Sequence, residues 1–305
     1  MIRFEKYHGT GNDFILIDAT ERVPDRRALA CELCDREHGV AQRTADGPGT
    51  PDSVGADGVL FLALEERYSP PRVVMTLVQP DGSTAAMCGN GARCAAAWAV
   101  DRTGSRQVMV DTQAGTRRAE VDAGTAAGGA DDGVEVTIGM GSPRFDPRSV
   151  PLAADIAEPL VAEPVAGLTV TAVDTGVPHA VAFVADVSTT DLKAVAPAVR
   201  HAPAFPEGAN VTIASRRSGG GFDQRTYERG VEGETDSCGT GAVAVAAVAR
   251  ERGLVTDDAV AVHPPGGRLE VSFSATGASL SGPVVREFDG ETPAVTPRAI
   301  DAVDD

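Results

Sequence analysis

Lysine is nearly absent from this sequence. Lysine and arginine together number 27 of the 305 residues, but only Lys6 and Lys193 are lysines. Enzymes that use pyridoxal phosphate hold it as a Schiff base on a lysine, and neither of these two residues lies in a Gly- or Ser-rich loop that could bind the phosphate. We therefore expect any amino-acid chemistry on this chain to proceed without pyridoxal phosphate.

Positive charge is also scarce. The chain carries 44 acidic residues and a formal net charge of -17. A surface of this sign repels nucleic acid and anionic membranes, so we expect neither as a partner. Two explanations of the acidity remain open, a genome rich in G and C, or a halophilic source in which salt screens the repulsion. The scarcity of lysine favours the halophilic source.

Long apolar segments are missing as well. No run of about 18 apolar residues occurs, so we expect no transmembrane helix. The N-terminal segment lacks the apolar core of a signal peptide, and we therefore expect a cytoplasmic protein. The 305 residues are enough for two domains. The oligomeric state stays open, with a homodimer as one alternative.

Cysteines are also few, and their number is odd. The chain has five, namely Cys31, Cys34, Cys88, Cys94 and Cys238. An odd count argues against a disulfide scaffold. Cys31 and Cys34 form a C-x-x-C, but no second pair and no spaced histidine pair completes a zinc site. We interpret these two as small apolar positions on one helix face, and Cys94 as a core residue. A thiol-redox or metal-binding protein that uses Cys31 and Cys34 is the alternative.

The most informative pattern is an internal repeat. Residues 84–92 (TAAMCGNGA) resemble residues 234–242 (ETDSCGTGA), with their cysteines 238 − 88 = 150 positions apart. The same offset aligns RAEV at 118–121 with RLEV at 268–271. Because the same offset of 150 positions holds from residue 84 to residue 121, the sequence predicts two similar domains, each with one cysteine at the equivalent place.

An apolar segment follows each of these two cysteines. Residues 92–100 and 242–250 are rich in Ala and Val and apolar nearly all round, which predicts two buried helices. Cys88 and Cys238 would then lie at helix N-termini, where unpaired N–H groups bind anions and lower the pKa of a thiol. If both ends met one substrate, one thiolate would remove an α-proton while the opposite thiol delivered another. The N–H donors would stabilise the enolate-like charge.

Several segments together resemble one family, diaminopimelate epimerase. They are HGTGNDF at 8–14, GADG at 55–58, DGS at 81–83, MCGNGARC at 87–94, GVPH at 176–179, YERG at 227–230, and ET and CGTG at 234–241. They occur in the family's order over nearly the whole chain, which in detail resembles the haloarchaeal members. The resemblance implies an α/β (α+β) fold of two pseudo-symmetric domains, each a central buried helix wrapped by mixed β-strands. The N-terminal domain would cover 1–139 plus 283–305 and the C-terminal domain 140–282, with the active site in the cleft between them.

The resemblance also implies roles for individual residues. Cys88 and Cys238 would be the acid–base pair that interconverts LL- and meso-diaminopimelate in lysine biosynthesis, with no metal and no cofactor. His179 and Glu228 would help to set the pKa values of the cysteines, although a core or capping role is an alternative for His179. Arg229 can bind a distal carboxylate in bidentate fashion. The substrate contacts would be Asn12, Gln79, Gly89, Asn90, Asn210, Glu228, Arg229, Gly239 and Thr240.

Two positions depart from the family pattern. The family often has Asn where this chain has Gln79 and Val177, and both would face the distal, non-reacting end of the substrate. The amide of Gln79 can still form a hydrogen bond, whereas the side chain of Val177 cannot. A racemase of another amino acid, of the histidine or glutamate type, is therefore an alternative on the same fold.

The remaining expectations concern local structure. The apolar residues 14–17 predict a strand, and residues 25–37 predict a helix. Polar segments rich in Gly and Pro predict surface loops, and the acidic C-terminus predicts a frayed tail. These loops and the tail are expected at 41–54, 123–133, 216–221 and 289–305.

Overall fold

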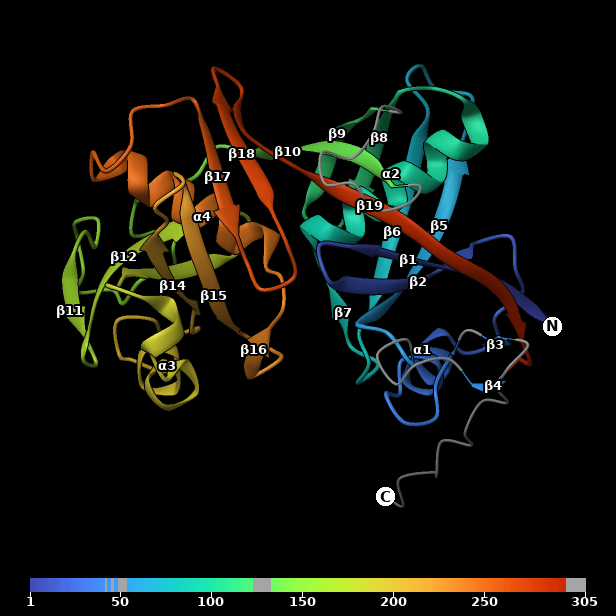
Figure 1. The fold of residues 1–305 in the computed structure, drawn as a ribbon, viewed down its shortest axis with the longest axis horizontal. Coiled ribbons are helices and arrows are strands. Elements are labelled where there is room, and N and C mark those ends of the chain that lie inside the picture. Colours follow the sequence, from blue (N-terminus) through green and yellow to red (C-terminus); the bar gives the residue numbers. More distant parts are fainter. Residues whose placement is uncertain (42, 45–46, 49–53, 123–132, 295–305) are drawn as a thin grey trace. The chain divides into compact units, whose positions relative to one another are not determined.

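A computed structural model describes the chain except for residues 42, 45–46, 49–53, 123–132 and 295–305 (Figure 1). The chain divides into two compact units. Unit 1 comprises Met1–Val134 and Val284–Asp305, and unit 2 comprises Glu135–Pro283. None of the helices in the described part of the chain has both the length and the apolar character that a membrane crossing requires.

Unit 1 contains seven strands of the main sheet and two helices. The strands are β1 (Ile2–Gly9), β2 (Asn12–Asp18), β5 (Gly58–Glu65), β6 (Arg72–Val78), β7 (Thr84–Ala85), β8 (Gln107–Thr112) and β9 (Gly115–Asp122). The helices are α1 (Arg26–Leu33) and α2 (Gly89–Thr103). Two short strands, β3 (Arg43–Thr44) and β4 (Gly47–Pro48), pair with each other in a separate sheet.

Unit 2 has a similar but not identical set of elements. Its strands are β11 (Glu163–Val165), β12 (Leu168–Asp174), β13 (Pro178–Phe183), β14 (Asn210–Arg216), β15 (Phe222–Glu228), β16 (Gly233–Thr235), β17 (Ala259–His263) and β18 (Leu269–Ser274). Its helices are α3 (Leu192–Arg200), α4 (Gly239–Glu251) and the 3₁₀ helix η2 (Val187–Thr189). Strands β10 (Val134–Gly141) and β19 (Gly277–Thr292) contribute residues to both units.

The two units have the same strand pairing, which confirms the internal repeat. In unit 1 the pairs β1/β2, β5/β6 and β8/β9 are antiparallel, and β2/β5 and β6/β8 are parallel. Unit 2 has the same alternation in β12/β13, β13/β14, β14/β15, β15/β17 and β17/β18. The predicted offset of 150 positions relates Arg72, which begins β6, to Phe222, which begins β15. The same offset relates the first residues of α2 and α4.

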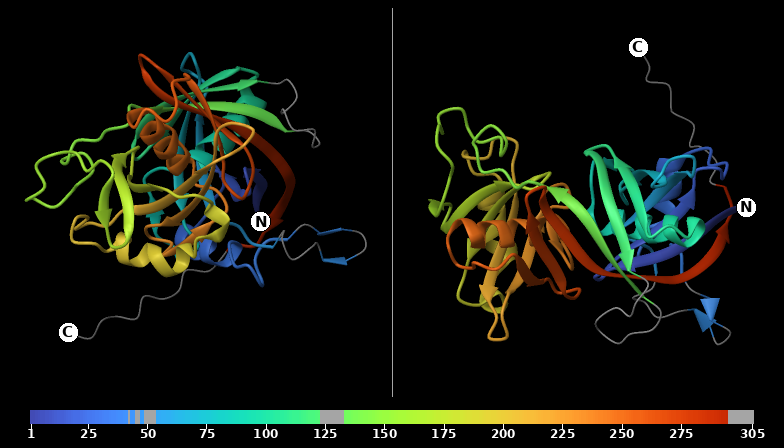
Figure 2. Two further views of the ribbon diagram at one scale, coloured as in Figure 1. Left: turned by 60° about the vertical axis from the view of Figure 1, so that its left-hand side comes forward. Right: turned by 90° about the horizontal axis from the view of Figure 1, so that it is seen from above.

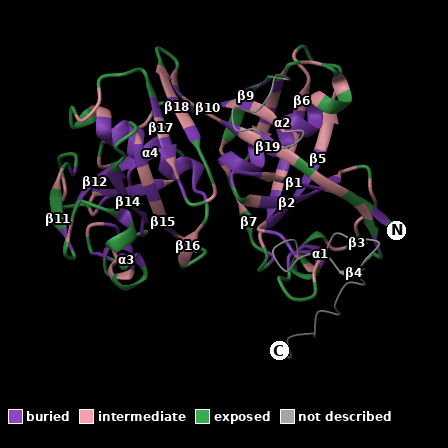
Figure 3. Ribbon diagram, in the orientation of Figure 1, coloured by how far each residue is buried: buried purple, intermediate pink, exposed green. Residues whose placement is uncertain are grey.

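One helix lies at the centre of each unit. Helix α2 is buried from Gly89 to Ala99 and α4 from Gly239 to Ala249, so the two predicted buried helices are confirmed (Figure 3). Figures 1 and 2 show α2, in teal, against the blue to green strands of its own unit. Because most of these buried side chains are Ala, Gly or Val, strands can pack closely around the helix axis.

Strands around the central helix are buried on both faces. In β2, residues 13–17 are all buried, and residues 14–17 form a continuous apolar run rather than an alternating one. Ile15 and Ile17 belong to the apolar cluster that also contains Leu29 and Ala30 of α1. The ring of Phe14 points to the other side and lies near Gly91 of α2. Helix α1 therefore covers the outer face of a sheet whose inner face holds α2.

Two local expectations are wrong. The C-terminal segment is not frayed from residue 289, because β19 continues to Thr292 and pairs with β1, from Ile2 opposite Thr292 to His8 opposite Val285. Helix α1 ends at Leu33 with Cys34 as its C-cap, four residues before the expected end at 37. Cys34, at the C-cap, is buried, whereas Cys31, inside the helix, is exposed, so the two do not form one apolar face.

The expected strand and loops have different outcomes. Strand β2 contains the predicted residues 14–17, and residues 217–221 connect β14 to β15 as expected. Most of the predicted loop at 41–54, namely residues 42, 45–46 and 49–53, lies outside the described residues. Nearly all of the loop at 123–133, namely residues 123–132, also lies outside them.

The repeat offers a matched pair of helix substitutions. A Cβ on Gly241 would lie 2.6 Å from Nε2 of Gln224 and 2.9 Å from Oγ1 of Thr226, whereas a Cβ on Gly91 would make ordinary contacts of 3.4 Å or more. We expect Gly241→Ala to lower the free energy of unfolding by about 1–3 kcal/mol because buried polar groups must move. Gly91→Ala should be neutral or stabilising by about 0.5 kcal/mol. Guanidinium denaturation of both variants tests this, and equal midpoints would contradict it.

Candidate functional site

Cys88 is the N-cap residue of α2. Its backbone is extended, with φ −142° and ψ 118°, and its Sγ accepts a hydrogen bond of 3.4 Å from the backbone N of Gly91. Gly89, the residue after Cys88, is the first residue of the helix. The sulfur is therefore held where the helix has unpaired N–H groups and a partial positive charge, which favours the thiolate.

Two side-chain amides lie close to Cys88. Asn12 follows the tight turn between β1 and β2, in which Thr10 and Gly11 have φ angles of 59° and 75°. Its Oδ1 lies 3.8 Å from Sγ of Cys88 and accepts a hydrogen bond of 3.3 Å from Nδ2 of Asn90. Asn90 is the second residue of α2 and is buried. In unit 1 the structure thus brings together four of the predicted site residues, Cys88, Gly89, Asn12 and Asn90.

Cys238 is the N-cap residue of α4, at the equivalent place in unit 2. Its backbone is extended, with φ −120° and ψ 103°, and its thiol is buried. The Sγ lies 3.4 Å from Oγ1 of Thr240, the second residue of the helix. The same hydroxyl lies 3.0 Å from Nε2 of His179, which stands on β13. The sequence prediction that each cysteine begins a buried helix is confirmed for both.

The tautomer of His179 follows from its neighbours. The backbone N of Arg229 donates to Oδ1 of Asn210 (2.7 Å), so the Nδ2 group of Asn210 faces Nε2 of His179 at 3.4 Å. Nε2 is then an acceptor, and the hydrogen on Nδ1 donates to Oγ1 of Thr212 (3.1 Å). Complete burial, and then the charge of Arg229, lower the pKa of His179 to about 3. His179 is therefore a neutral hydrogen-bonding group near neutral pH.

The polar network continues below the helix end. Oγ1 of Thr212 lies 3.1 Å from Oγ1 of Thr226, which accepts from Nε2 of Gln224 at 3.0 Å. Nε2 of Gln224 also donates to the backbone oxygen of Cys238 at 3.2 Å. All three side chains are buried, and such a network fixes the geometry of its members because each lost bond would leave a buried polar group unsatisfied.

Arg229 and Glu228 end β15 and begin the following turn. One guanidinium nitrogen of Arg229 donates to the backbone oxygens of Glu207 and Gly208, each at 3.3 Å. The carboxylate of Glu228 accepts from the hydroxyl of Thr235. Together with Asn210, both residues therefore stand in the same unit as Cys238, Thr240 and His179, which the sequence also predicted as site residues.

The two positions that depart from the family pattern lie in turns. Gln79 stands at the end of β6, and its Oε1 accepts a hydrogen bond of 3.0 Å from Oγ of Ser83. This contact directs the NH₂ group of Gln79 away from Ser83, as a donor. Val177 lies in the turn between β12 and β13, half-buried, and its backbone oxygen accepts from the N of Thr175 at 3.2 Å.

Sequence reasoning missed several polar neighbours of the site. Asp57 contacts Asn12, and Arg93 contacts Asn90. Neither Asp57 nor Arg93 was predicted as a site residue, although they lie within the motifs GADG and MCGNGARC. Their motif membership was the available signal. Thr212, Thr226 and Gln224 were not predicted, because single Thr and Gln residues in a strand do not reveal their partners on the neighbouring elements.

The C-x-x-C alternative finds little support. Cys34 is buried, and burial raises the pKa of its thiol to about 12, which disfavours a reactive thiolate. Among the described residues, no group of three or more His, Cys, Asp or Glu side chains is arranged to hold a metal ion. Cys94 is fully buried in α2, as predicted for a core residue.

Comparison with known proteins identifies relatives over nearly the full chain. The family model described as diaminopimelate epimerase matches residues 49–145 and 171–287. A protein of Methanocella arvoryzae named diaminopimelate epimerase is 43% identical over 297 residues, covering 95% of this chain and 96% of the relative. One of Methanothrix thermoacetophila with the same name is 43% identical over 290 residues, covering 93% of each.

Solved structures agree on the fold. A phenazine biosynthesis protein from Bacillus anthracis has a TM-score of 0.65 at 14% identity, covering 96% of this chain and 99% of that one. At this identity the likeness concerns the fold alone, and it confirms the expected α+β architecture with one buried helix in each repeat. From the family match and the full-length relatives together, the chain belongs to the diaminopimelate epimerase family.

Proposed function

We propose that this chain is a cofactor-independent epimerase that interconverts LL- and meso-diaminopimelate in lysine biosynthesis, with Cys88 and Cys238 as its two acid–base groups. Family membership supports the reaction and the substrate. One observation carries the assignment of the cysteines, since each caps a buried helix at the same place in the repeat. The two thiols would act on opposite faces of one α-carbon.

The proposed reaction needs one proton removed and one delivered. A thiolate takes the α-proton and becomes a thiol, and the electron pair of the broken C–H bond remains on the α-carbon and its carboxylate. The opposite thiol then gives its proton to the other face and becomes a thiolate. The reverse reaction exchanges the two roles, so both cysteines must reach both protonation states near the working pH.

The helix ends supply the electrostatic part of the mechanism. Gly89 and Asn90, with Gly239 and Thr240, would hold the carboxylate and amine of the reacting end, and their backbone N–H groups would donate to the carboxylate. Fixed donors aimed at the developing enolate-like oxygens lower the barrier because they need no reorganisation during the reaction.

The remaining predicted residues would bind the rest of the substrate. Arg229 suits a distal carboxylate, and Glu228 suits an ammonium group. Asn12, Asn210 and Gln79 would add amide hydrogen bonds. We assign the pKa-modulating role of His179 to the Thr240 hydroxyl that it contacts. The acceptor Nε2 takes the hydrogen of this hydroxyl, so the hydroxyl oxygen is left to accept a hydrogen bond from the Cys238 thiol.

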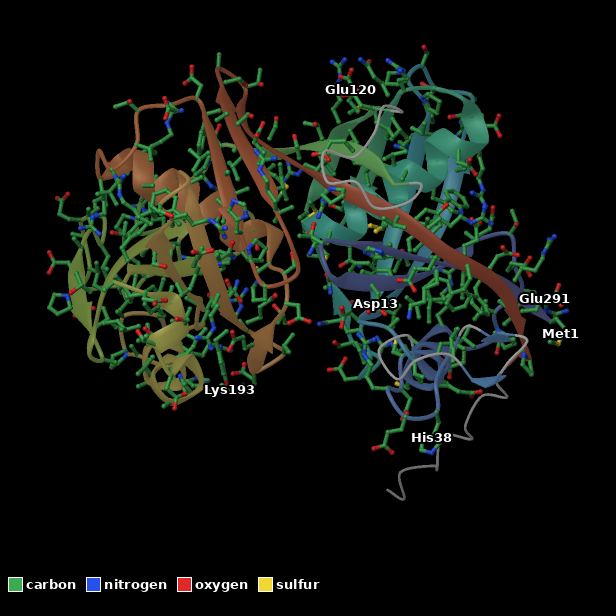
Figure 4. All side chains as sticks on the ribbon, viewed as in Figure 1. Met1, Asp13, His38, Glu120, Lys193 and Glu291 are labelled. Carbon is green, nitrogen blue, oxygen red and sulfur yellow. The ribbon has the colours of Figure 1, made fainter. Side chains whose placement is uncertain are left out.

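Lysine chemistry offers no competing mechanism in this chain. The ammonium of Lys6 is buried and pairs with Asp13 at 2.8 Å, and Lys193 is exposed on α3 (Figure 4). The net charge of -17 further supports the proposal of a salt-rich cytoplasm as the working environment. A homodimer is compatible with the proposal, which needs only one chain.

A racemase of another amino acid is the second candidate. Val177 motivates it, because its side chain offers no hydrogen bond to a distal amine or carboxylate. The relatives named diaminopimelate epimerase favour the first candidate. Incubation in deuterated water with LL-diaminopimelate, L-histidine and L-glutamate separates the two, because the α-hydrogen of the true substrate exchanges with solvent.

The first prediction concerns the two cysteines. We expect Cys88→Ala and Cys238→Ala each to lower epimerisation of diaminopimelate by about 10³-fold or more, since each removes one of two acid–base groups. Mass spectrometry of deuterium at the α-carbon measures this loss. Cys31→Ala is the control and should retain full turnover. Full activity in either catalytic-position variant would overturn the two-base assignment.

A second prediction concerns the distal end of the substrate. Arg229→Lys replaces a planar fork by a single ammonium, so we expect KM for diaminopimelate to rise by about 10- to 100-fold with a smaller change in kcat. The exposed Arg217→Lys, in the same unit, is the matched control. An unchanged KM for Arg229→Lys would remove this residue from the binding site.

A third prediction follows from the low pKa of His179. The buried group has a pKa of about 3 against about 6.5 in the unfolded chain, so the unfolded state binds a proton first as pH falls. Stability from this group is complete above about pH 6.5, and about 2 kcal/mol is lost on lowering the pH to 5. Denaturation curves at pH 7.5 and 5 should show a smaller loss in His179→Gln than in the unsubstituted protein. His38→Gln, at an exposed position, should leave the loss unchanged, and an equal loss in all three proteins would refute the assignment.

A further inference from the structure

The amides of Asn12 and Asn90 lie between two charged groups of opposite sign. At one end, the fully buried Arg93 donates through Nη2 to Oδ1 of Asn90 (2.7 Å) and to Oγ1 of Thr10 (2.9 Å). At the other end, Oδ2 of Asp57 accepts a hydrogen bond from Nδ2 of Asn12. The same carboxylate oxygen accepts from the backbone N of Asp13 at 3.1 Å.

The charged groups of Arg93 and Asp57 determine the orientation of each amide. A guanidinium can only donate hydrogen bonds, so Asn90 must turn its oxygen to Arg93 and its nitrogen to Asn12. A carboxylate can only accept, so Asn12 must turn its nitrogen to Asp57. Its oxygen then faces Nδ2 of Asn90 at 3.3 Å and Sγ of Cys88 at 3.8 Å. A flip of either amide would place two donors or two acceptors together.

We propose that Asp57 and Arg93 are positioning residues for epimerisation, which together hold Asn12 with its carbonyl oxygen, and not its NH₂ group, toward the sulfur of Cys88. This inference deepens the proposed function and rests on it. An oxygen at this place accepts a hydrogen bond from the thiol and disfavours the thiolate. It therefore opposes the helix end and the Gly91 N–H, which favour the thiolate, and keeps both forms of Cys88 accessible.

The Asp57 carboxylate is itself held by an ion-pair cluster in unit 1. Arg36 contacts Oδ1 of Asp57 at 2.6 Å and Oδ1 of Asp13 at 2.8 Å, and Lys6 contacts Oδ2 of Asp13 at 2.8 Å. Glu287 is the next acidic group, 3.9 Å from Lys6. Figure 4 labels Asp13 at the start of β2. Burial and the charge of Asp13 raise the pKa of Asp57, while the charge of Arg36 and the hydrogen bond from Asn12 lower it. Arg36 therefore favours the ionised, acceptor-only form of Asp57 next to Asn12.

The test measures the reactivity of Cys88 directly. In full-length Cys238→Ala protein, iodoacetamide labelling of the Cys88 peptide is followed by mass spectrometry at pH 7. We expect Asp57→Asn to accelerate this labelling by about 3- to 10-fold, because the released Asn12 can turn its NH₂ group to the sulfur and stabilise the thiolate. The matched control is Asp111→Asn, which also removes a carboxylate of unit 1 that faces an arginine but is not part of the cluster.

A double-mutant cycle separates positioning from simple charge removal. If Asp57 acts through Asn12, Asp57→Asn should change the labelling rate by less than about 1.5-fold in an Asn12→Ala background. Acceleration of the same size in that background would overturn the proposal, because it would show a through-space effect of the charge.

A second pair of variants tests the contact between Arg93 and Asn90. Arg93→Lys keeps a charged donor for Asn90 and should label within about 2-fold of the parent, whereas Arg93→Met should be accelerated as Asp57→Asn is. Equal rates in Arg93→Met and the parent, with unchanged thermal unfolding, would exclude a role for Arg93. Labelling does not depend on turnover. Loss of the proposed function would instead appear as absent α-hydrogen exchange in the unsubstituted enzyme.

Discussion

Both units depend on a helix that can be buried along nearly its whole length, including its first turn. A buried helix start leaves backbone N–H groups without partners in the helix, and these groups need an acceptor. Small residues, mainly Ala, Gly and Val, allow the strands to surround α2 and α4 so closely. The cap position of each helix is occupied by a cysteine, whose sulfur is a weak acceptor as a thiol and a strong one as a thiolate. In α2 the sulfur of Cys88 supplies such an acceptor, because it accepts a hydrogen bond from the backbone N of Gly91.

The two sulfurs have different surroundings although the repeat places them equivalently. Around Cys88 the neighbours are amides whose directions are fixed by charged groups, Arg93 and Asp57. Around Cys238 the neighbour is a hydroxyl, Thr240, backed by a neutral imidazole. The direction of the Thr240 hydroxyl is set by a neutral acceptor, Nε2 of His179, whereas the directions of the two amides are set by ionic groups. The two helix starts are thus related in backbone and distinct in hydrogen bonding.

Much of the architecture could be predicted because it rests on patterns that the chain repeats. The offset between Cys88 and Cys238 correctly predicted two similar units, and the apolar segments after them predicted the buried helices. Helix α1 shows the limit, since it ends at Leu33 and the C-cap geometry at Cys34 carries no strong sequence signal. The partners of His179 were not predictable, because Thr212 and Thr240 come from elements that meet only in the folded unit.

The end of the chain has a consequence for biosynthesis. Unit 2 is one continuous segment, Glu135–Pro283, whereas unit 1 needs Val284 and the residues after it. Residues 285–292 of β19 pair along the whole of β1 except its last residue. Strand β1 can pair with β2 early, but it receives this second partner only after β19 has been translated. Domains that are contiguous in sequence can fold during synthesis. Although most of unit 1 is translated before unit 2, unit 2 is therefore able to reach its native strand pairing first.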